Sequence, residues 1–432
     1  MVIDPLFRRS LSWFRRAPGW ALVVALATAA LAVAAATAPL VADAAADRAF
    51  AAEVAASADA PPGQSLDVRA ATRGIVDPAG ISAVSAVLDD LPGYDTAVAA
   101  VSPLAPYIDA TGPLPVIRSA TGDQAPAIVY ARDGAVESLG GSDAGSPGVW
   151  VPDSVAADLH LQAGDRAEVT LARAGAGEMV VVAPVPVTVL GVYPTRANLP
   201  VSDGIDWTAI PGGVPRHPLS RNRPAPLLIA DRTTALSLIA AMGDTSFVTW
   251  DVPWVAPIDI AHGRKAADGV KAADRALHGS DSPIQATVQL AGGTSPDLGS
   301  GVNSFVERSD QAAAELQPLV ASIALTGRVM SGLVLVVAVW LLTRGRRREH
   351  QLSISMGVHP IRLALTTGLE LLVPAIVGIG VAYAVVRWQP QWIAGDGTIG
   401  ARLIRHATSD VLRTLPVAAL LAVFAAFAGV WP

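Results

Sequence analysis

The residues that most clearly indicate a function lie in one polar stretch between two long apolar runs. This stretch, residues 344–370, reads RGRRREHQLSISMGVHPIRLALTTGLE, and its first half is too polar to cross a membrane. Within it, Leu352, Met356 and His359 recur at the i, i+4, i+7 spacing of one helix face. The pattern predicts a short amphipathic helix at the cytoplasmic surface. A positively charged turn that only fixes membrane topology explains the stretch equally well.

The sequence lacks the common motifs of enzymatic chemistry. It has no GxxxxGK[ST] phosphate loop, no HExxH zinc motif and no GxSxG nucleophile elbow. Its 7 histidines show no metal-ligand spacing, and the absence of cysteine excludes disulfides, thiolate zinc sites and iron–sulfur clusters. We therefore expect no catalytic residue, no metal and no bound cofactor. A membrane-anchored enzyme is the least favoured hypothesis.

The composition indicates a membrane protein with a large water-exposed part. Of the 432 residues, 52% are hydrophobic and only 16% are charged, whereas soluble domains carry about 25% charged residues. Residues 43–320 hold 32 acidic and 17 basic side chains, a net charge of −15, and the remainder holds 5 and 14, a net charge of +9. An acidic middle between basic, apolar ends predicts an external domain held by membrane segments. Nucleic acid is excluded as its partner, because the middle has no basic footprint.

Four apolar runs are long enough to cross a bilayer core. They predict a cytoplasmic N-terminus at 1–19, spans at 20–42, 322–343, 361–386 and 411–432, and an extracytoplasmic domain at 43–321. They also predict a cytoplasmic segment at 344–360 and an outer loop at 387–410. Arginine clusters before the first span and after the second place both on the cytoplasmic side, although the outer loop is also arginine-rich. A cleaved signal peptide is the alternative for the first run, but its apolar region usually has about 7–15 residues.

The extracytoplasmic segment mixes helical and strand patterns. Helices are expected at 43–58, 78–90, 233–241, 264–277 and 303–316, and strands at 64–71, 127–131, 148–151, 166–171, 180–182, 185–192 and 284–290. The first and last of these helices would form a stalk. The remainder would divide into an α/β subdomain and a β-rich subdomain at about 148–226.

Two segments resemble the FtsX/MacB-type ABC permease family. Residues 344–371 hold, in order, Arg-Arg-Arg-Glu, a short apolar run, Met-Gly-Val, a basic residue and Leu-Glu-Leu, like that family's coupling helix and the span after it. Residues 149–194 contain VWVPDSVAADLHLQAGDRAEVTL and VPVTVLGVY, which resemble its external domain. The resemblance covers about 20–60, 149–194 and 303–432. It departs at His350, where the family has an apolar residue, and at Pro432, where the family continues into a cytoplasmic tail.

The resemblance implies an α-helical membrane protein with four transmembrane helices plus a large α+β extracytoplasmic domain, like the MacB periplasmic core, on a helical stalk. It implies the permease subunit of an ABC-type system in the cell membrane, which converts ATP hydrolysis by a separate ATP-binding subunit into movement of the extracytoplasmic domain for export or extraction. Further partners would be a second permease copy or half, membrane lipids, and an extracytoplasmic protein or lipid substrate. The alternative is a mechanotransmitting regulator of an extracytoplasmic cell-wall hydrolase, without transport.

The resemblance also assigns roles to residues. Contact with the ATPase falls to Arg346, Arg347, Arg348, Glu349, Leu352, Ser355, Met356, Gly357, His359 and Arg362. The three consecutive arginines could instead bind anionic lipid headgroups. Arg328 and Glu370 lie inside expected spans, where a charge is costly and marks a functional site by default. We expect Arg328 to snorkel outward and Glu370 to face the bundle interior.

Overall fold

The computed structural model describes residues 18–57, 64–74, 77–103, 114–139, 147–174, 179–181, 184–194, 226–279, 282–290 and 293–393. The chain divides into two compact units, which are described separately. Unit 1 comprises Met1–Phe50 and Glu307–Pro432, and unit 2 comprises Ala51–Val306.

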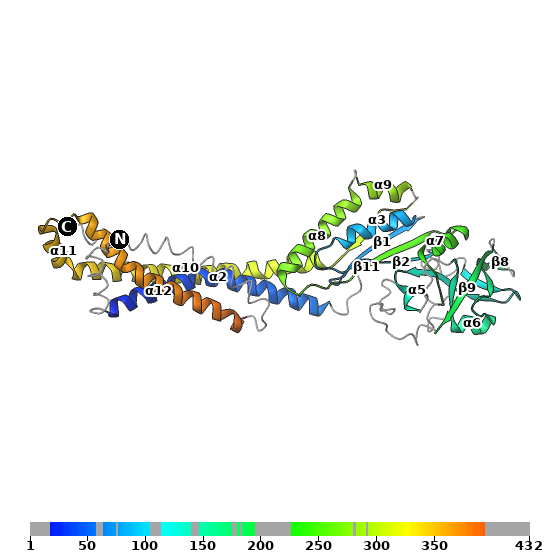
Figure 1. Ribbon diagram of the computed structural model, residues 1–432, viewed down its shortest axis with the longest axis horizontal. Coiled ribbons are helices and arrows are strands. Elements are labelled where there is room, and N and C mark those ends of the chain that lie inside the picture. The colour runs from blue at the N-terminus through cyan, green and yellow to red at the C-terminus, as the bar shows by residue number, and fades with distance from the viewer. Residues whose placement is uncertain are drawn as a thin grey trace, which may run out of the picture. The chain divides into compact units, whose positions relative to one another are not determined.

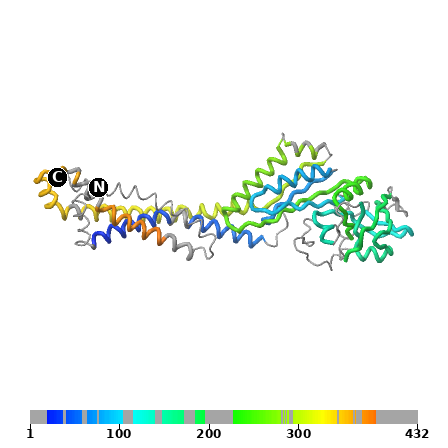
Figure 2. The backbone as a smooth tube through the Cα atoms, viewed as in Figure 1, coloured from blue at the N-terminus to red at the C-terminus, as the bar shows by residue number. Residues whose placement is uncertain are grey.

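Unit 1 is helical. It is built from α2 (Pro18–Ala56), α10 (Val302–Gly345), α11 (Arg347–Ser355) and α12 (Pro360–Ile393). Figures 1 and 2 show the three long helices side by side within this unit. Their shared core comprises Val24, Ala27, Leu335, Ala338, Val339 and Leu371. Small residues bring the backbones close together, because a Cβ atom added at Gly378 of α12 would lie 2.3 Å from the carbonyl oxygen of Ala25 on α2.

Two of the described helices are long and apolar enough to cross a membrane. The segment Gly19–Ala56 reaches a mean hydropathy of 2.3, and Val302–Leu341 reaches 1.9. Only 11% of the most apolar stretch of Val302–Leu341 is buried, against 44% for Gly19–Ala56. The second segment therefore does not have the burial of a core helix in a soluble protein.

The expected fold class, four transmembrane helices with an α+β domain on a helical stalk, is wrong for the part of the chain that the structure describes. Its two candidate spans are joined by a large mixed sheet, and no stalk is shown. The expected third span, 361–386, lies within α12, of which the described residues form an apolar segment at Glu370–Val385. The expected fourth span, 411–432, lies outside the described residues.

Unit 2 is organised around a sheet of twelve described strands. Its order is β12 (Asp297–Gly299), β1 (Val68–Gly74), β11 (Ser246–Val252), β2 (Val98–Pro103), β5 (Ile128–Arg132), β10 (Leu227–Ile229), β6 (Val149–Pro152), β9 (Val185–Tyr193), β7 (Arg166–Ala174), β3 (Leu114–Ser119) and β4 (Gln124–Pro126), with β8 (Met179–Val181) beside β7. The pairs β5–β10 and β6–β9 are parallel, and the other pairs are antiparallel. The expected subdomain regions are thus joined through one sheet.

The two ends of unit 2 meet in this sheet. Strand β1 pairs with β12, so that Arg69 lies opposite Gly299. Next to this pair, the backbone N–H of Gly301 donates to the carbonyl oxygen of Ser65 at 2.9 Å. A segment of more than two hundred residues therefore starts and finishes at one place.

Three helices, α3 (Pro78–Asp89), α8 (Ile260–His278) and α9 (Pro283–Leu290), lie over one face of β1, β11 and β2 (Figure 1). Asp77 and Asp259 cap the first two, each carboxylate accepting a backbone N–H from the first turn. The core on this side includes Trp250, which is fully buried and donates its Nε1–H to the Ser85 hydroxyl of α3 at 3.1 Å.

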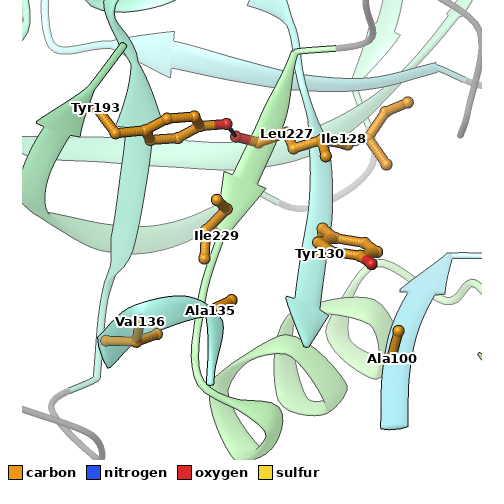
Figure 3. Packing of buried hydrophobic residues seen from close by; sticks show 8 residues of the cluster. All are labelled: Ala100, Ile128, Tyr130, Ala135, Val136, Tyr193, Leu227 and Ile229. Atoms are coloured by element: carbon orange, nitrogen blue, oxygen red, sulfur yellow. Dashed lines mark hydrogen bonds between the residues drawn. The ribbon is translucent and has the colours of Figure 1, made fainter. Parts of the chain in front are cut away.

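A second core lies on β5 and β10, where α5 (Ala135–Ser138) covers the sheet (Figure 3). The hydroxyl of Tyr193 reaches across it and donates to the carbonyl oxygen of Leu227 at 2.5 Å. The remaining helices, α6 (Asp153–Leu159) and α7 (Arg232–Ala241), pack against β4, β6 and β9 and against β2, β5 and β11, respectively. Both cores therefore consist of buried apolar side chains together with a buried aromatic residue, Trp250 or Tyr193, whose polar group donates a hydrogen bond.

Most of the elements expected from the sequence are confirmed with small shifts at their ends. The helices at 43–58, 78–90, 233–241, 264–277 and 303–316 correspond to parts of α2, α3, α7, α8 and α10, and six of the seven strands correspond to β1, β5, β6, β7, β8 and β9. The strand expected at 284–290 is wrong, because this segment is helix α9. Pro283 stands at the first helical position, and the Ser282 hydroxyl accepts the N–H of Gln285, as in a helix cap.

Candidate functional site

The candidate site is the junction of α10, α11 and α12 in unit 1. Of the three residues expected on one helix face here, Leu352 lies in a helix, whereas Met356 follows its end and His359 lies beyond it. This helix is α11. It ends in a Schellman motif, in which Gly357 takes a φ of +87° and the N–H of Val358 donates to Ser353 at 3.0 Å. Glycine reaches this left-handed conformation without a Cβ clash. Pro360 then starts α12 at a position where its missing N–H costs nothing.

One ion pair ties this junction to α12. Arg346, between α10 and α11, places its Nη1 2.5 Å from Oε2 of Glu370. The side chains are only 15% and 11% exposed. Glu370 thus faces the helical interior, as the sequence suggested, and Arg346 turns inward toward it. Removing the Arg346 charge would leave the buried Glu370 carboxylate without this ion pair, which is destabilising.

His350 is the buried side chain of α11. The residue is 7% exposed, and its Nδ1 has no hydrogen-bond partner in the part of the chain that the structure describes. Burial lowers the pKa of His350, the positive charge of Arg346 lowers this pKa further, and Glu349 partly opposes both. The histidine therefore packs as a neutral residue, in the position where the resembled family has an apolar one.

Apolar side chains of α11 point the other way, into solvent. Leu352 is 62% exposed and Met356 at the end of the helix is 75% exposed. They stand four residues apart, which places them on one side of the helix. Ile354 is 41% exposed but lies two residues from each of them, and therefore on a different side of the helix. We call Leu352 and Met356 the α11 apolar surface.

The remaining predicted site residues surround this surface without forming a further cluster among the described residues. Arg347, Arg348, Glu349, Gly357, His359 and Arg362 are exposed. The Ser355 hydroxyl donates to the carbonyl oxygen of Leu352 at 2.7 Å, which satisfies it within the helix. At the end of α10, the Arg344 guanidinium lies over the Trp340 ring, 4.9 Å from its centroid.

Arg328 lies elsewhere in unit 1, on α10. Its Nη2 donates to the carbonyl oxygen of Ala35 on α2 at 2.9 Å. The guanidinium thus has a hydrogen-bond partner on a neighbouring helix. Its outward snorkelling stays a prediction. It does not join the site at α11.

Sequence reasoning missed two features of this site. The pairing of Arg346 with Glu370 joins residues 24 positions apart, and a spacing rule cannot reveal it. The burial of His350 had a visible signal, because it replaces an apolar residue of the resembled family. The substitution indicates burial only once it is known which side of α11 packs against the neighbouring helices.

Comparison with known proteins assigns no family. No protein-family model matches the chain, and no curated protein matches it. The function must therefore be argued from the chemistry of the site.

Proposed function

We propose that this chain is the membrane subunit of an ABC-type system and that α11 is its contact with a separate ATP-binding subunit. The observation that carries the proposal is the inverted polarity of α11, whose histidine is buried while its leucine and methionine are exposed. Exposed apolar side chains that stand next to one another mark an interaction surface.

A protein partner explains the α11 apolar surface better than lipid does. The helix is short and flanked by exposed charges, among them Arg347, Arg348 and Glu349, so that it would present a narrow apolar stripe within a charged rim. This combination of an apolar centre and a polar rim is typical of protein interfaces. Methionine suits such a surface, because its flexible side chain adapts to the partner.

The Arg346–Glu370 pair supports a role in transmitting movement. It connects the start of α11 with α12, and the Schellman turn connects the end of α11 with the start of α12. A partner that displaces α11 would therefore displace α12 with it. A packed element with two discrete positions is what such a mechanism requires.

The orientation follows from the positive-inside rule. In this proposal α2 and α10 cross the cell membrane, and the arginines around the α10–α11 junction keep α11 in the cytoplasm. Unit 2 lies between these crossings in the chain and would stand outside the cytoplasm. The protein would thus be a multi-pass membrane protein, and its acidic external part would receive the movement.

In this proposal ATP binds to the partner, and this chain has no catalytic residue. ATP hydrolysis by the partner would move α11, and unit 2 would use the movement for export or extraction of a substrate. A second copy or half of the permease would complete the assembly. Regulation of a cell-wall hydrolase without transport is the alternative, and its mark would be a stable complex with such a hydrolase.

The proposal is tested by purification of the full chain from native membranes in mild detergent, with mass spectrometry of bound proteins. We expect a phosphate-loop ATPase to accompany the wild type and to be lost from the double variant Leu352→Asp, Met356→Asp. The ATPase activity of the reconstituted pair should fall with the loss of binding.

The matched control is the variant Gln351→Asp. It adds one negative charge, half of the double variant's two, to the same exposed helix without removing an apolar side chain. It should keep the ATPase. An ATPase absent from the wild type, or retained equally by the double variant, would contradict the proposal.

A further inference from the structure

A cavity of about 440 Å³ lies in unit 2, at the turn between β3 and β4 and on the adjoining strands β7 and β9. Its size falls within the range of about 300–1,000 Å³ that is typical of small-molecule sites. Its lining includes Arg118, Thr121, Gly122, Arg166, Glu168 and Pro186. Charged side chains thus surround a cavity that α11 and the proposed function do not involve.

The strand register places three of these charges on one face of the sheet. Arg118 on β3 lies directly opposite Glu168 on β7. Arg166 lies two residues before Glu168 on the same strand, and therefore on the same face. Cβ atoms of opposite residues stand about 5 Å apart, and diagonal neighbours about 7–8 Å. The arrangement is a carboxylate with one guanidinium across from it and another beside it.

These charges do not neutralise one another. Among the described residues, no ion pair or hydrogen bond joins the side chains of Arg118, Arg166 and Glu168 to each other or to other side chains. Arg118 instead leans toward the turn, where its Nη2 lies 3.5 Å from the position that a Cβ atom on Gly122 would occupy. The charged groups are therefore available to a molecule in the cavity.

The turn itself is fixed by its own hydrogen bonds. Gly122 has a φ of +94°, and its N–H donates to Ser119 at 3.0 Å. The Thr121 hydroxyl donates to Asp123 at 2.8 Å and lies 2.7 Å from the Ser119 hydroxyl, from which it accepts. The hydroxyl protons of the rim are thus already used. Recognition in the cavity falls to the three charged side chains.

We propose that this cavity binds a small zwitterion that carries a carboxylate and a protonated amine, as a free α-amino acid does. The two guanidinium groups would hold the carboxylate through charge-assisted hydrogen bonds, and Glu168 would hold the ammonium group. A simple anion would meet the charge of Glu168, and a simple cation would meet two arginines. Each would lose part of its binding to like-charge repulsion, which helps a site to select against wrong ligands. The inference is independent of the proposed ATPase contact.

The test uses the full chain in nanodiscs of deuterated phosphatidylcholine and saturation-transfer difference NMR. The probes are an equimolar mixture of the twenty standard α-amino acids, followed by the strongest binder alone. We expect at least one amino acid to receive saturation. Its N-acetyl derivative, its amide and inorganic phosphate should each bind about tenfold or more weakly, because each lacks either the ammonium group or the carboxylate that the site would hold.

Variants distinguish this cavity from other surfaces. Arg118→Gln, Arg166→Gln and Glu168→Gln should each weaken binding about tenfold or more. Lys271→Gln, which removes a charge from an exposed position on α8, should leave binding unchanged. Thermal unfolding of each variant shows whether it is folded. The proposal is overturned if no amino acid binds, if phosphate or the N-acetyl derivative binds equally well, or if folded variants of all three residues bind like the wild type.

Discussion

At the scale of single residues, the most informative position is His350. It is buried on a helix whose leucine and methionine are exposed. It lies close enough to Arg346 for the positive charge of that residue to lower its pKa. A neutral imidazole can stand in for an apolar side chain, whereas an imidazolium cannot. The packing of α11 therefore depends on the protonation state of one residue.

Acid should loosen α11 through this histidine. Because the pKa of His350 in the folded state lies below its ordinary value of 6.5, the contribution to stability is fully present above about pH 6.5 and is lost as the pH falls through the folded pKa. We expect the hydrogen-exchange protection of α11, corrected for intrinsic exchange, to decline between about pH 7 and pH 5.

Two variants at histidines check this assignment. His350→Leu keeps the apolar volume and should remove the pH dependence. His359→Gln alters an exposed histidine in the following turn and should retain it. Equal protection of wild-type α11 at both pH values would contradict the prediction.

At the scale of elements, the close approach of α2 and α12 depends on one glycine. A Cβ atom at Gly378 would lie 2.3 Å from the Ala25 carbonyl oxygen, whereas a Cβ atom at Gly380 would meet nothing within 4 Å. Both glycines lie in α12, so that the same substitution at either has the same effect on helix propensity. Comparing the two substitutions therefore separates the effect of helix packing from the effect of helix propensity.

Gly378→Ala should therefore destabilise unit 1 by about 1–3 kcal/mol, the typical cost of overpacking. Gly380→Ala should be neutral or stabilise the helix by up to about 1 kcal/mol. Thermal unfolding of the full chain in nanodiscs, followed by circular dichroism, measures both. Equal midpoints for the two variants would show that the helices do not approach one another at Gly378.

The elements also show how far the sequence could be read. Helices α3, α7 and α8 were predictable, because each begins at an aspartate whose carboxylate accepts first-turn N–H groups. Strand β11 was missed although its residues alternate between buried and less buried, a pattern that the sequence SFVTWDV carries. Helix α9 was mistaken for a strand, because its β-branched residues outweighed the cap signal of Ser282 and Pro283.

The candidate site was predictable only in part. The arginine-rich sequence and the Met-Gly-Val turn located α11, since a glycine after a helix is a local signal. The Arg346–Glu370 pair and the cavity charges depend on which elements meet. Such contacts are set by tertiary packing, and no spacing within one segment encodes them.

At the scale of the whole molecule, unit 2 has the properties of a self-contained domain. It has its own sheet and cores, and its first and last strands pair with each other. Residues 64–301 expressed alone should therefore give a folded protein with a cooperative thermal transition and the far-UV spectrum of a mixed α/β domain. A fragment without a cooperative transition would show that unit 2 needs the helices of unit 1.

The pairing of β1 with β12 has a consequence for how this protein can change over evolutionary time. When the first and last residues of an inserted domain lie side by side, the helices that flank it need not move to accommodate it. Unit 2 can thus be replaced by another domain, with different binding properties, while the helices of unit 1 stay the same. The sequences of proteins descended from this chain should differ most within unit 2 and least around Ser65 and Gly301, where its two ends are hydrogen-bonded.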